Sequence, residues 1–324
     1  MAGPGHTDPD TGTDTATDTD TGVRADSGSG AGTGAGHPLR IGAKLVPQGT
    51  TIATLRAFWR LADESGFDHL WVYDHLAGVG NAATVAEPDP AIELFEGWSL
   101  LAAMASETRN ARIGCMVTAN TFRHPAMLAK IATTVDHLSG GRLEFGIGAG
   151  WAEYEHRMLG LELGGGRQRI EKLDEALRII KALWSPERFT DFAGEHYTLD
   201  KAVHAPKPVQ APHPPIWLGG TGEKRMLKLV AEQADVWNAV NHNGVEEAAR
   251  LSGVLDRWCA EIGRDPGEIR RSVQLRPDPA RVLDDVAPWV AAGFTEIVLF
   301  FGPEQPLADL EQVAERLPAL RALG

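Results

Sequence analysis

The sequence predicts an α/β fold, a (β/α)8 TIM barrel with insertions after the second strand and before the fifth. From Leu39 onward, short β-branched or aromatic runs alternate with longer segments of helical period, which is typical of βα units and a parallel sheet. Eight such runs share residues 37–324, so each unit takes about 36 residues, close to what a barrel requires. No Gly-x-Gly-x-x-Gly follows the first strand, so an open doubly wound sheet is the weaker alternative.

The eight expected strands are separated by segments with the apolar spacing of helices. The strands are Ile41–Val46, His69–Tyr73, Ala111–Val117, Arg142–Ile147, Pro215–Leu218, Asp235–Val240, Ile269–Leu275 and Glu296–Phe301. Leu128, Ile131 and Val135 share one face of such a helix. Pro125 suits its first turn, and Gly140 supplies the left-handed residue that ends it.

The surplus length falls in two long connections, Leu76–Gly97 and Ser185–Pro214. The second connection is rich in proline and has the pattern of a hairpin over Phe189–Tyr197. We interpret this hairpin as a lid or an interface element.

Residues 1–36 have the composition of a disordered acidic tail. They contain six Asp, nine Gly, one Arg and no aromatic residue, so they have almost nothing to bury. The expected division is therefore a tail over 1–36 and one barrel domain over 37–324. Since the tail carries −5 of the net charge of −13, the barrel carries −8.

Composition also excludes several classes of function and partner. An acidic chain without a Lys/Arg cluster lacks the footprint of a nucleic-acid binder. No stretch approaches the roughly 18 apolar residues of a membrane span, and no secretory signal is recognisable, so we expect a cytoplasmic protein. The two cysteines, Cys115 and Cys259, form no Cys-x-x-Cys or Cys/His cluster, so no disulfide framework or metal site is predicted. Cys115 is expected to be buried and inert.

Polar and glycine residues directly after the strands are the candidates for a site, because barrel enzymes place their chemistry at the carboxyl ends of the strands. Two glycine segments, Gly146–Gly150 and Gly219–Glu223, lead from a strand towards a helix. Backbone N–H groups are unpaired there and the helix dipole favours an anion, so these loops are candidates to hold a phosphate. Tight turns alone would also explain glycine at these places.

Asp74 and His75 end the second strand and form the best acid–base candidate. An imidazole transfers a proton near neutral pH, and the adjacent carboxylate sets its tautomer or binds a cofactor ring. A structural histidine that caps the strand end is the alternative. Thr118 and Asn120, after the third strand, offer a hydroxyl and an amide suited to the polar edge of a heterocycle, although both types are common in turns.

Three tryptophans, Trp98, Trp151 and Trp237, are candidates to wall an apolar pocket around a flat ligand, with core packing as the alternative. Hydrolytic chemistry is not supported, because the chain has no Gly-x-Ser-x-Gly, no His-Glu-x-x-His and no P-loop.

Four spaced motifs in order give the chain a family resemblance. They are Leu70–Leu76, Val117–Pro125, Leu138–Leu143 with Gly148–Trp151, and Pro214–Gly220. With these motifs the ordered chain resembles the bacterial-luciferase-like monooxygenase superfamily, in particular its branch of oxidoreductases dependent on the deazaflavin coenzyme F420. The resemblance implies a (β/α)8 barrel, which the strand count had reached independently.

The resemblance also implies which residues bind the cofactor. Its ring would lie in the barrel mouth and its phosphate on the two glycine loops. The residues so implicated are Asp74, His75, Thr118, Asn120, Gly148, Ala149, Gly150, Gly219, Gly220, Thr221 and Gly222. Many deazaflavin enzymes of this group have a non-prolyl cis peptide against the ring, which by position would join Met116 and Val117.

Asp74-His75-Leu76 is the deazaflavin form of the second strand's end, whereas FMN-using relatives usually have Glu-His-His there. Deazaflavin carries hydride and reacts little with oxygen. The sugar-phosphate dehydrogenases of the family place Glu where this chain has Trp151, and Trp a few residues after the strand-two histidine, where this chain has Ala77, Gly78 and Val79. These departures disfavour sugar phosphates and point to a small, fairly apolar organic substrate.

The function expected from the sequence is hydride transfer between F420 and that substrate, with His75 and Asp74 as catalytic candidates. Residues expected near the substrate are Trp98, Trp151, Glu96, His156 and Trp237. An FMN-dependent monooxygenase that uses reduced flavin and O2, and a non-catalytic cofactor-binding protein, are the alternatives. Family likeness implies a homodimer. The barrel's charge of −8 should repel a polyanionic coenzyme unless its mouth is locally basic.

Overall fold

The computed structural model describes residues 37–78, 89–239 and 244–324. The expected tail over 1–36 lies outside the described residues, as do Val79 and the last residue of the strand expected over 235–240. The described residues belong to one compact unit, Gly36–Gly324.

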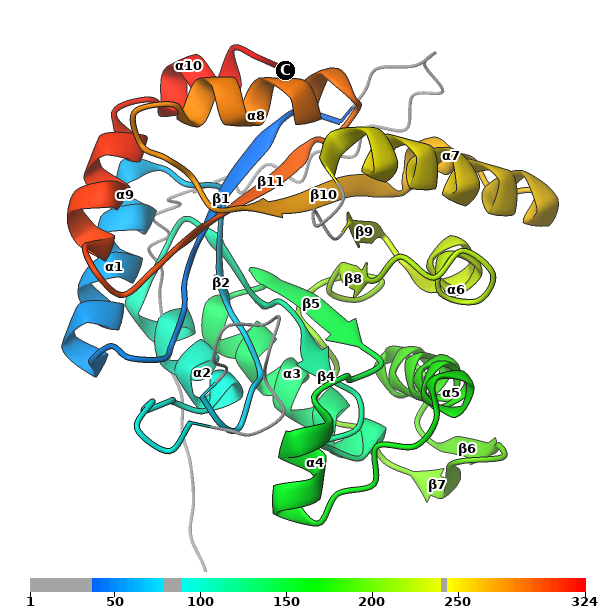
Figure 1. The fold of residues 1–324 in the computed structure, drawn as a ribbon. Helices are drawn as coiled ribbons and strands as arrows, with labels where there is room; N and C mark the ends of the chain where they lie inside the picture. Colours follow the sequence, from blue (N-terminus) through cyan, green and yellow to red (C-terminus); the bar gives the residue numbers. More distant parts are fainter. Residues whose placement is uncertain (1–36, 79–88, 240–243) are drawn as a thin grey trace, which may run out of the picture. The chain divides into compact units, whose positions relative to one another are not determined.

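Eight parallel strands close into a barrel, as the sequence predicts (Figure 1). The strands are β1 (Arg40–Leu45), β2 (His69–Val72), β3 (Arg112–Cys115), β5 (Leu143–Gly148), β8 (Ile216–Gly219), β9 (Val236–Ala239), β10 (Arg270–Leu275) and β11 (Glu296–Phe301). Each pairs with its neighbours in chain order, β11 pairs with β1, and β3 pairs with β5. A two-residue strand, β4 (Thr118–Ala119), extends the third position and also pairs with β5.

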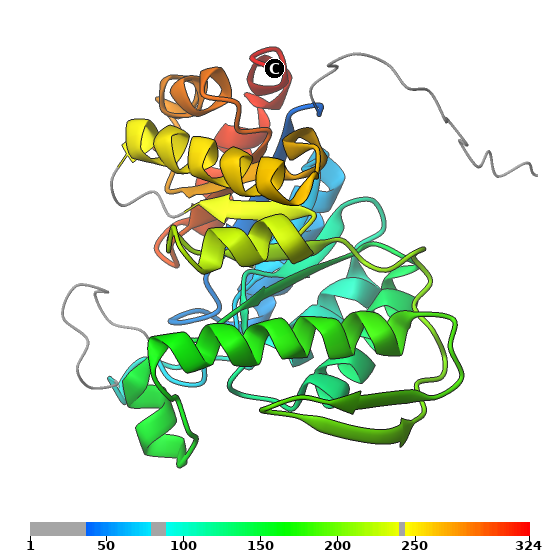
Figure 2. The same ribbon diagram turned by 90° about the vertical axis from the view of Figure 1, so that its right-hand side faces the viewer.

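Helices surround the barrel (Figure 1). They are α1 (Ile52–Ser65), α2 (Gly97–Glu107), α3 (Pro125–Ser139), α4 (Glu153–Leu159), α5 (Gly166–Trp184), α6 (Met226–Gln233), α7 (Gly244–Ile262), α8 (Val282–Ala291), α9 (Pro306–Ala314) and α10 (Leu317–Arg321). Figure 2 shows α5, α6 and α7 next to one another across one side. The expected ends of α3 are confirmed, because His124 caps its first turn and Gly140 ends it at φ 66°.

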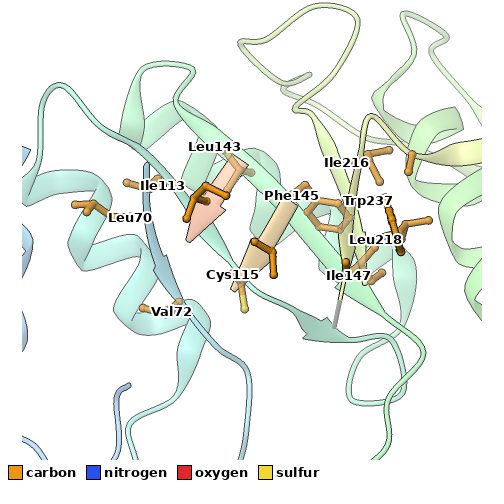
Figure 3. Close-up of a cluster of buried hydrophobic side chains, with 14 of the residues drawn as sticks. Leu70, Val72, Ile113, Cys115, Leu143, Phe145, Ile147, Ile216, Leu218 and Trp237 are labelled. Carbon is orange, nitrogen blue, oxygen red and sulfur yellow. The ribbon is translucent and has the colours of Figure 1, made fainter. Parts of the chain in front are cut away.

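Alternation along the strands sends side chains to two different cores. The outward side chains pack against the helices, and Figure 3 shows part of this layer, with Leu70 and Val72 beside Ile113 and Cys115. Cys115 is buried as expected, and burial raises the pKa of its thiol. The inward side chains form a smaller apolar cluster that includes Trp71 and other residues of the barrel interior.

The amino-terminal end of the barrel interior is closed by an ion cluster. Glu144 and Glu296 are fully buried there. Arg40 bonds both carboxylates, at 3.2 Å and 2.9 Å, and Arg270 bonds Glu296 at 2.5 Å. His69 Nε2 lies 3.1 Å from Glu296. These contacts neutralise two buried carboxylates, which would otherwise be costly to bury.

The long connection before β8 forms the expected hairpin, from β6 (Thr190–Ala193) and β7 (Thr198–Ala202). It lies beside α5 (Figure 2), and buried Glu175 of α5 accepts hydrogen bonds from the backbone N–H groups of residues 195–197. No residue of 185–214 lines the cavity at the carboxyl ends of the strands. The hairpin therefore packs on the outside of the barrel and does not cover that cavity.

Candidate active site

A cavity of about 1070 Å³ opens at the carboxyl ends of the strands. It is lined by many of the residues that the sequence selects, namely Asp74, His75, Met116, Val117, Gly148, Ala149, Gly150, Trp151, His156, Gly219, Gly220, Thr221 and Gly222. The strand ends of the barrel therefore bring residues about 150 positions apart in the sequence to one site.

The two glycine loops form one rim of this cavity. Gly150 has φ 80°, and a Cβ there would lie 2.5 Å from Thr121 Oγ1, so only glycine fits without strain. Gly220 has φ 136°, which likewise favours glycine. At Gly219 the nearest atoms to an added Cβ are 3.9 Å away. The missing side chain there leaves backbone exposed to the cavity.

His75 is held by a carboxylate that the sequence did not single out, Glu155 of α4. Glu155 Oε2 lies 2.9 Å from His75 Nδ1, and its Oε1 accepts from the backbone N–H groups of Leu76 at 2.6 Å and Ala77 at 3.1 Å. Burial opposes ionisation of Glu155, but these hydrogen bonds outweigh it and hold its pKa below the ordinary value. A carboxylate accepts only, so Nδ1 carries a proton and Nε2 is left as the basic nitrogen.

Two aromatic rings fix the imidazole from the sides. The His75 ring meets Tyr73 edge-on at 5.1 Å between centroids and Trp151 at 5.6 Å. The His75 side chain is 19% exposed, so the ring is held in place and still reaches the cavity. Trp151 is exposed at the mouth.

Asp74 is bound on all sides by donors. Arg123 donates to its two oxygens at 2.6 Å and 3.0 Å, and the Thr118 hydroxyl also donates to it. Trp98 Nε1 in turn donates to Thr118 at 2.9 Å. Arg123 has a second carboxylate, Glu96, at 2.6 Å. Asp74 is therefore arranged to hold a fixed position beside His75.

Five of the expected site residues do not line the cavity: Thr118, Asn120, Trp98, Glu96 and Trp237. Strand alternation explains why Trp237 does not line the cavity: its neighbours on β9 face the barrel interior, so Trp237 faces the helices. Its Nε1 donates to Gly220 O at 2.8 Å. Thr118 and Asn120 flank Ala119, which lines the cavity in their place. Glu96 caps the N-terminus of α2 and, with Trp98, borders a separate cavity of about 520 Å³.

His156 lines the cavity, but both of its ring nitrogens are bonded. Nδ1 lies 2.7 Å from Ala152 O and Nε2 lies 2.7 Å from Thr121 Oγ1. The carbonyl oxygen accepts only, so Nδ1 is the donor and Nε2 receives the hydroxyl proton. His75 is thus better placed than His156 for proton transfer.

The peptide bond between Met116 and Val117 is cis, which confirms the expectation from the resemblance. Both residues line the cavity, and Val117 packs within 2.9 Å of the position that a Cβ on Gly148 would take.

The outer part of the cavity is locally basic. Arg167, Lys224 and Arg225 line it, together with one acidic residue, Glu223, which is paired with Arg250 at 2.7 Å. The repulsion expected from the barrel's net charge is thereby offset at the mouth.

Sequence reasoning missed Glu155, Tyr73, Asn238 and Gln274 of the cavity wall. Tyr73, Asn238 and Gln274 follow from alternation along their strands, a signal that was available. Glu155 was not distinguishable from Glu153, since both lie in the first turn of α4 and only the fold decides which faces His75.

In the described parts of the chain, no helix is long and apolar enough to cross a membrane. Within the same residues, no group of three or more His, Cys, Asp and Glu side chains is arranged to hold a metal ion.

The structure is a parallel (β/α)8 barrel with a cavity at the carboxyl ends of its strands, and comparison with known proteins gives its family. The family model described as luciferase-like monooxygenase matches residues 33–322. The chain belongs to this family.

Relatives include both deazaflavin and flavin enzymes. An uncharacterised protein of Mycobacterium tuberculosis strain H37Rv is 31% identical over 269 residues, which cover 80% of this chain and 91% of that protein. An F420-dependent glucose-6-phosphate dehydrogenase of Kineococcus radiotolerans is 29% identical over 266 residues, 80% of this chain and 75% of that enzyme. The oxygenase component of a flavin-dependent trigonelline monooxygenase from Acinetobacter baylyi is 31% identical over 205 residues, 63% of this chain and 52% of that protein.

Solved structures share the fold. The coenzyme F420-dependent tetrahydromethanopterin reductase of Methanopyrus kandleri superposes with a TM-score of 0.73 at 17% identity, covering 88% of this chain and 100% of that one. The predicted luciferase-like barrel is therefore confirmed.

Proposed function

We propose that the protein is an oxidoreductase that transfers a hydride between coenzyme F420 and a small, fairly apolar organic substrate. The observation that carries the proposal is one cavity that combines a glycine rim, a basic outer edge and a histidine poised by a buried carboxylate. F420-dependent relatives at about 29% identity support the choice of cofactor.

The residues of the cavity fit such a cofactor. The glycine rim leaves the room that side chains would fill, as the open space at Gly219 shows. Arg167, Lys224 and Arg225 suit an anionic tail, and the first helical turn of α6, which has no side-chain cap, suits its phosphate. Apolar side chains such as Met116 offer a face for a flat ring.

When bound, the deazaflavin supplies the hydride chemistry itself. His75 Nε2 is the atom that we assign to proton transfer at the substrate, with Glu155 fixing the tautomer and Asp74 fixing the strand end. Trp151 and Phe122 offer the substrate apolar surface and limit access of water. The protein otherwise contributes by aligning donor and acceptor carbons.

The test is to titrate the purified protein with F420 and with FMN and follow absorbance. We expect tight binding of F420. Tight binding of FMN with no affinity for F420 would show that the cofactor assignment is wrong.

Turnover is then tested with enones, imines and alcohols. His75→Asn should lower kcat at least about 100-fold, as expected for loss of an acid–base group. His124→Asn is the matched control, because His124 caps α3 and does not line the cavity. Cofactor binding without turnover of any of these substrates by the wild type would instead indicate a non-catalytic binding protein.

A second candidate is an FMN-dependent monooxygenase, which the trigonelline monooxygenase relative and an FMNH2-dependent dimethylsulfone monooxygenase relative of Pseudomonas putida favour. Oxygen uptake that depends on substrate and on supplied reduced FMN would identify it.

A further inference from the structure

Lys44 is a cation buried directly behind the cavity wall. It is an inward-facing residue near the carboxyl end of β1 and is 8% exposed. Its Nζ donates to Gln274 Oε1 and lies 5.8 Å from the centroid of the Tyr73 ring. Gln274 and Tyr73 both line the cavity, so one layer of side chains separates the ammonium group from whatever the cavity holds.

This charge has no anionic partner among the residues that the structure describes. None of the ion pairs formed by described Asp and Glu residues includes Lys44, whereas the partly buried Arg123, which bonds the cavity residue Asp74, pairs with two carboxylates. The ionisable group that interacts with Lys44 is the Cys115 thiol, which burial keeps neutral by raising its pKa. Burial lowers the pKa of Lys44 to about 8, so the amine is still mainly protonated at pH 7.

The charge is coupled to the cavity through two amides. A protonated lysine only donates, so it fixes Gln274 with its oxygen towards Nζ and its nitrogen towards Asn238 Oδ1, at 3.1 Å. Asn238 Nδ2 then donates to Ser272 Oγ at 3.0 Å. Gln274 and Asn238 are both cavity residues, so Lys44 orients and polarises two polar groups of the wall.

A buried ammonium without a counter-ion is unfavourable, and an anion in the adjacent cavity would relieve the cost. Hydride transfer would create such an anion. In the oxidation of an alcohol, for example, the C–H bond would break, its hydride would pass to the ring of the bound cofactor, and the hydroxyl proton would pass to His75 Nε2 as the carbonyl forms. The ring would thereby gain two electrons and one proton, and so one negative charge.

We propose that Lys44 is an electrostatic positioning residue that supplies the counter-charge for the reduced cofactor, so that the protein binds the reduced form in preference to the oxidised form. This inference rests on the proposed function, because it requires a hydride-accepting ring in the cavity. Lys44 acts through Gln274 and Asn238 and does not itself exchange a proton with the substrate.

The experiment compares full-length wild type with Lys44→Met, which keeps the length of the side chain and removes its charge. Dissociation constants for oxidised and dithionite-reduced F420 are measured at pH 7 by absorbance titration, and FMN is tested in parallel. In Lys44→Met the preference for the reduced form should fall about tenfold. The reason is that the lost unit charge lies one layer of side chains from the cavity and acts on the charge of the bound ring through an effective dielectric constant of about 20. For a two-electron couple, that lowers the potential of the bound cofactor by about 30 mV. Lys44→Arg, which keeps the charge, should restore most of the preference.

Lys181→Met is the matched control. Lys181 lies on α5, burial lowers its pKa as it does for Lys44, and its Nζ also bonds a glutamine, Gln233, at 3.0 Å, but it does not line the cavity or contact its wall. The control should leave the preference unchanged. An equal shift in Lys181→Met, or no shift in folded Lys44→Met, would overturn the role of Lys44.

Three further outcomes each have a defined meaning. If Lys44→Met does not fold, Lys44→Gln makes the same test, since it retains a donor to Gln274 without the charge. If the wild type binds neither F420 nor FMN, the proposed function fails and this inference fails with it. If the wild type binds F420 and only the shift is missing, the proposed function stands and Lys44 has no such role.

Discussion

Substitution of Glu296 by Gln removes the central charge of the ion cluster at the closed end of the barrel. Glu296 is fully buried and accepts hydrogen bonds from Arg40 Nε at 2.9 Å and 3.0 Å, from Arg270 at 2.5 Å and from His69 at 3.1 Å. Burial opposes its ionisation, but His69, Arg40 and Arg270 outweigh that effect and lower its pKa to about 2. The carboxylate is therefore a strong stabilising element of the folded state.

The size of the effect follows from this pKa. The ordinary pKa of a glutamate is 4.5, about 2.5 pH units above that of Glu296 in the folded protein. Ionised Glu296 therefore stabilises the folded state relative to the unfolded state by about 3 kcal/mol. Because the pKa is lowered on folding, this stability is fully present above pH 4.5 and is lost as the pH falls towards 2. In Glu296→Gln the two partly buried arginines, Arg40 and Arg270, also lose a counter-charge, so we expect a loss of about 3–5 kcal/mol at pH 7. For a domain of this size that lowers Tm by about 5–8 °C.

The assay is thermal and urea denaturation of the wild type and Glu296→Gln at pH 7 and at steps down to pH 2.5. Below pH 4.5 the difference in the free energy of unfolding between the two proteins should decrease by most of its pH 7 value. Glu268→Gln is the control, because Glu268 pairs with Arg264 at 3.0 Å on the surface and is 60% exposed, and such pairs contribute less than about 1 kcal/mol. A Tm change for Glu296→Gln within about 2 °C of the control would refute the reasoning.

Three further predictions concern the cavity. Glu155→Gln should lower kcat/KM about 10–100-fold and leave the Kd for the cofactor nearly unchanged, because His75 loses the carboxylate that sets its tautomer. Steady-state kinetics and cofactor titration check this. An equal loss of cofactor affinity would indicate that Glu155 has a merely structural role. Gly150→Ala should weaken cofactor binding more than tenfold, since the new Cβ would lie 2.5 Å from the hydroxyl oxygen of Thr121. The control Gly160→Ala should show only a small loss of stability, because Gly160 also has a positive φ, 67°, but no atom lies within 4 Å of the new Cβ. The Kd for F420 should rise with salt concentration in the wild type and less steeply in Arg225→Gln, because basic side chains line the cavity mouth. Tighter binding at high salt would show instead that the net acidic charge of the barrel dominates.

Much of the fold was predictable from local sequence. The last strand was predicted residue for residue as Glu296–Phe301, and the other seven strands were found with shifts of one or two residues at their ends. The reason is that β-branched runs, helix caps and left-handed glycines act within a few residues of the chain. The same local signals place Asp74-His75 and the glycine loops at the carboxyl ends of strands, which is enough to predict where the site lies.

The sequence by itself therefore determined the order of the elements and the strand ends that carry the site. Only the tertiary structure decided which side chains meet there. Glu155 rather than Glu153 reaches His75, and Trp237 packs outward against the helices. The partner of Lys44, which lies in an otherwise apolar strand, could not be predicted from the sequence, because Gln274 of β10 is 230 positions away and contacts Lys44 only in the folded barrel. Such partners depend on barrel closure and strand register, which no local pattern encodes.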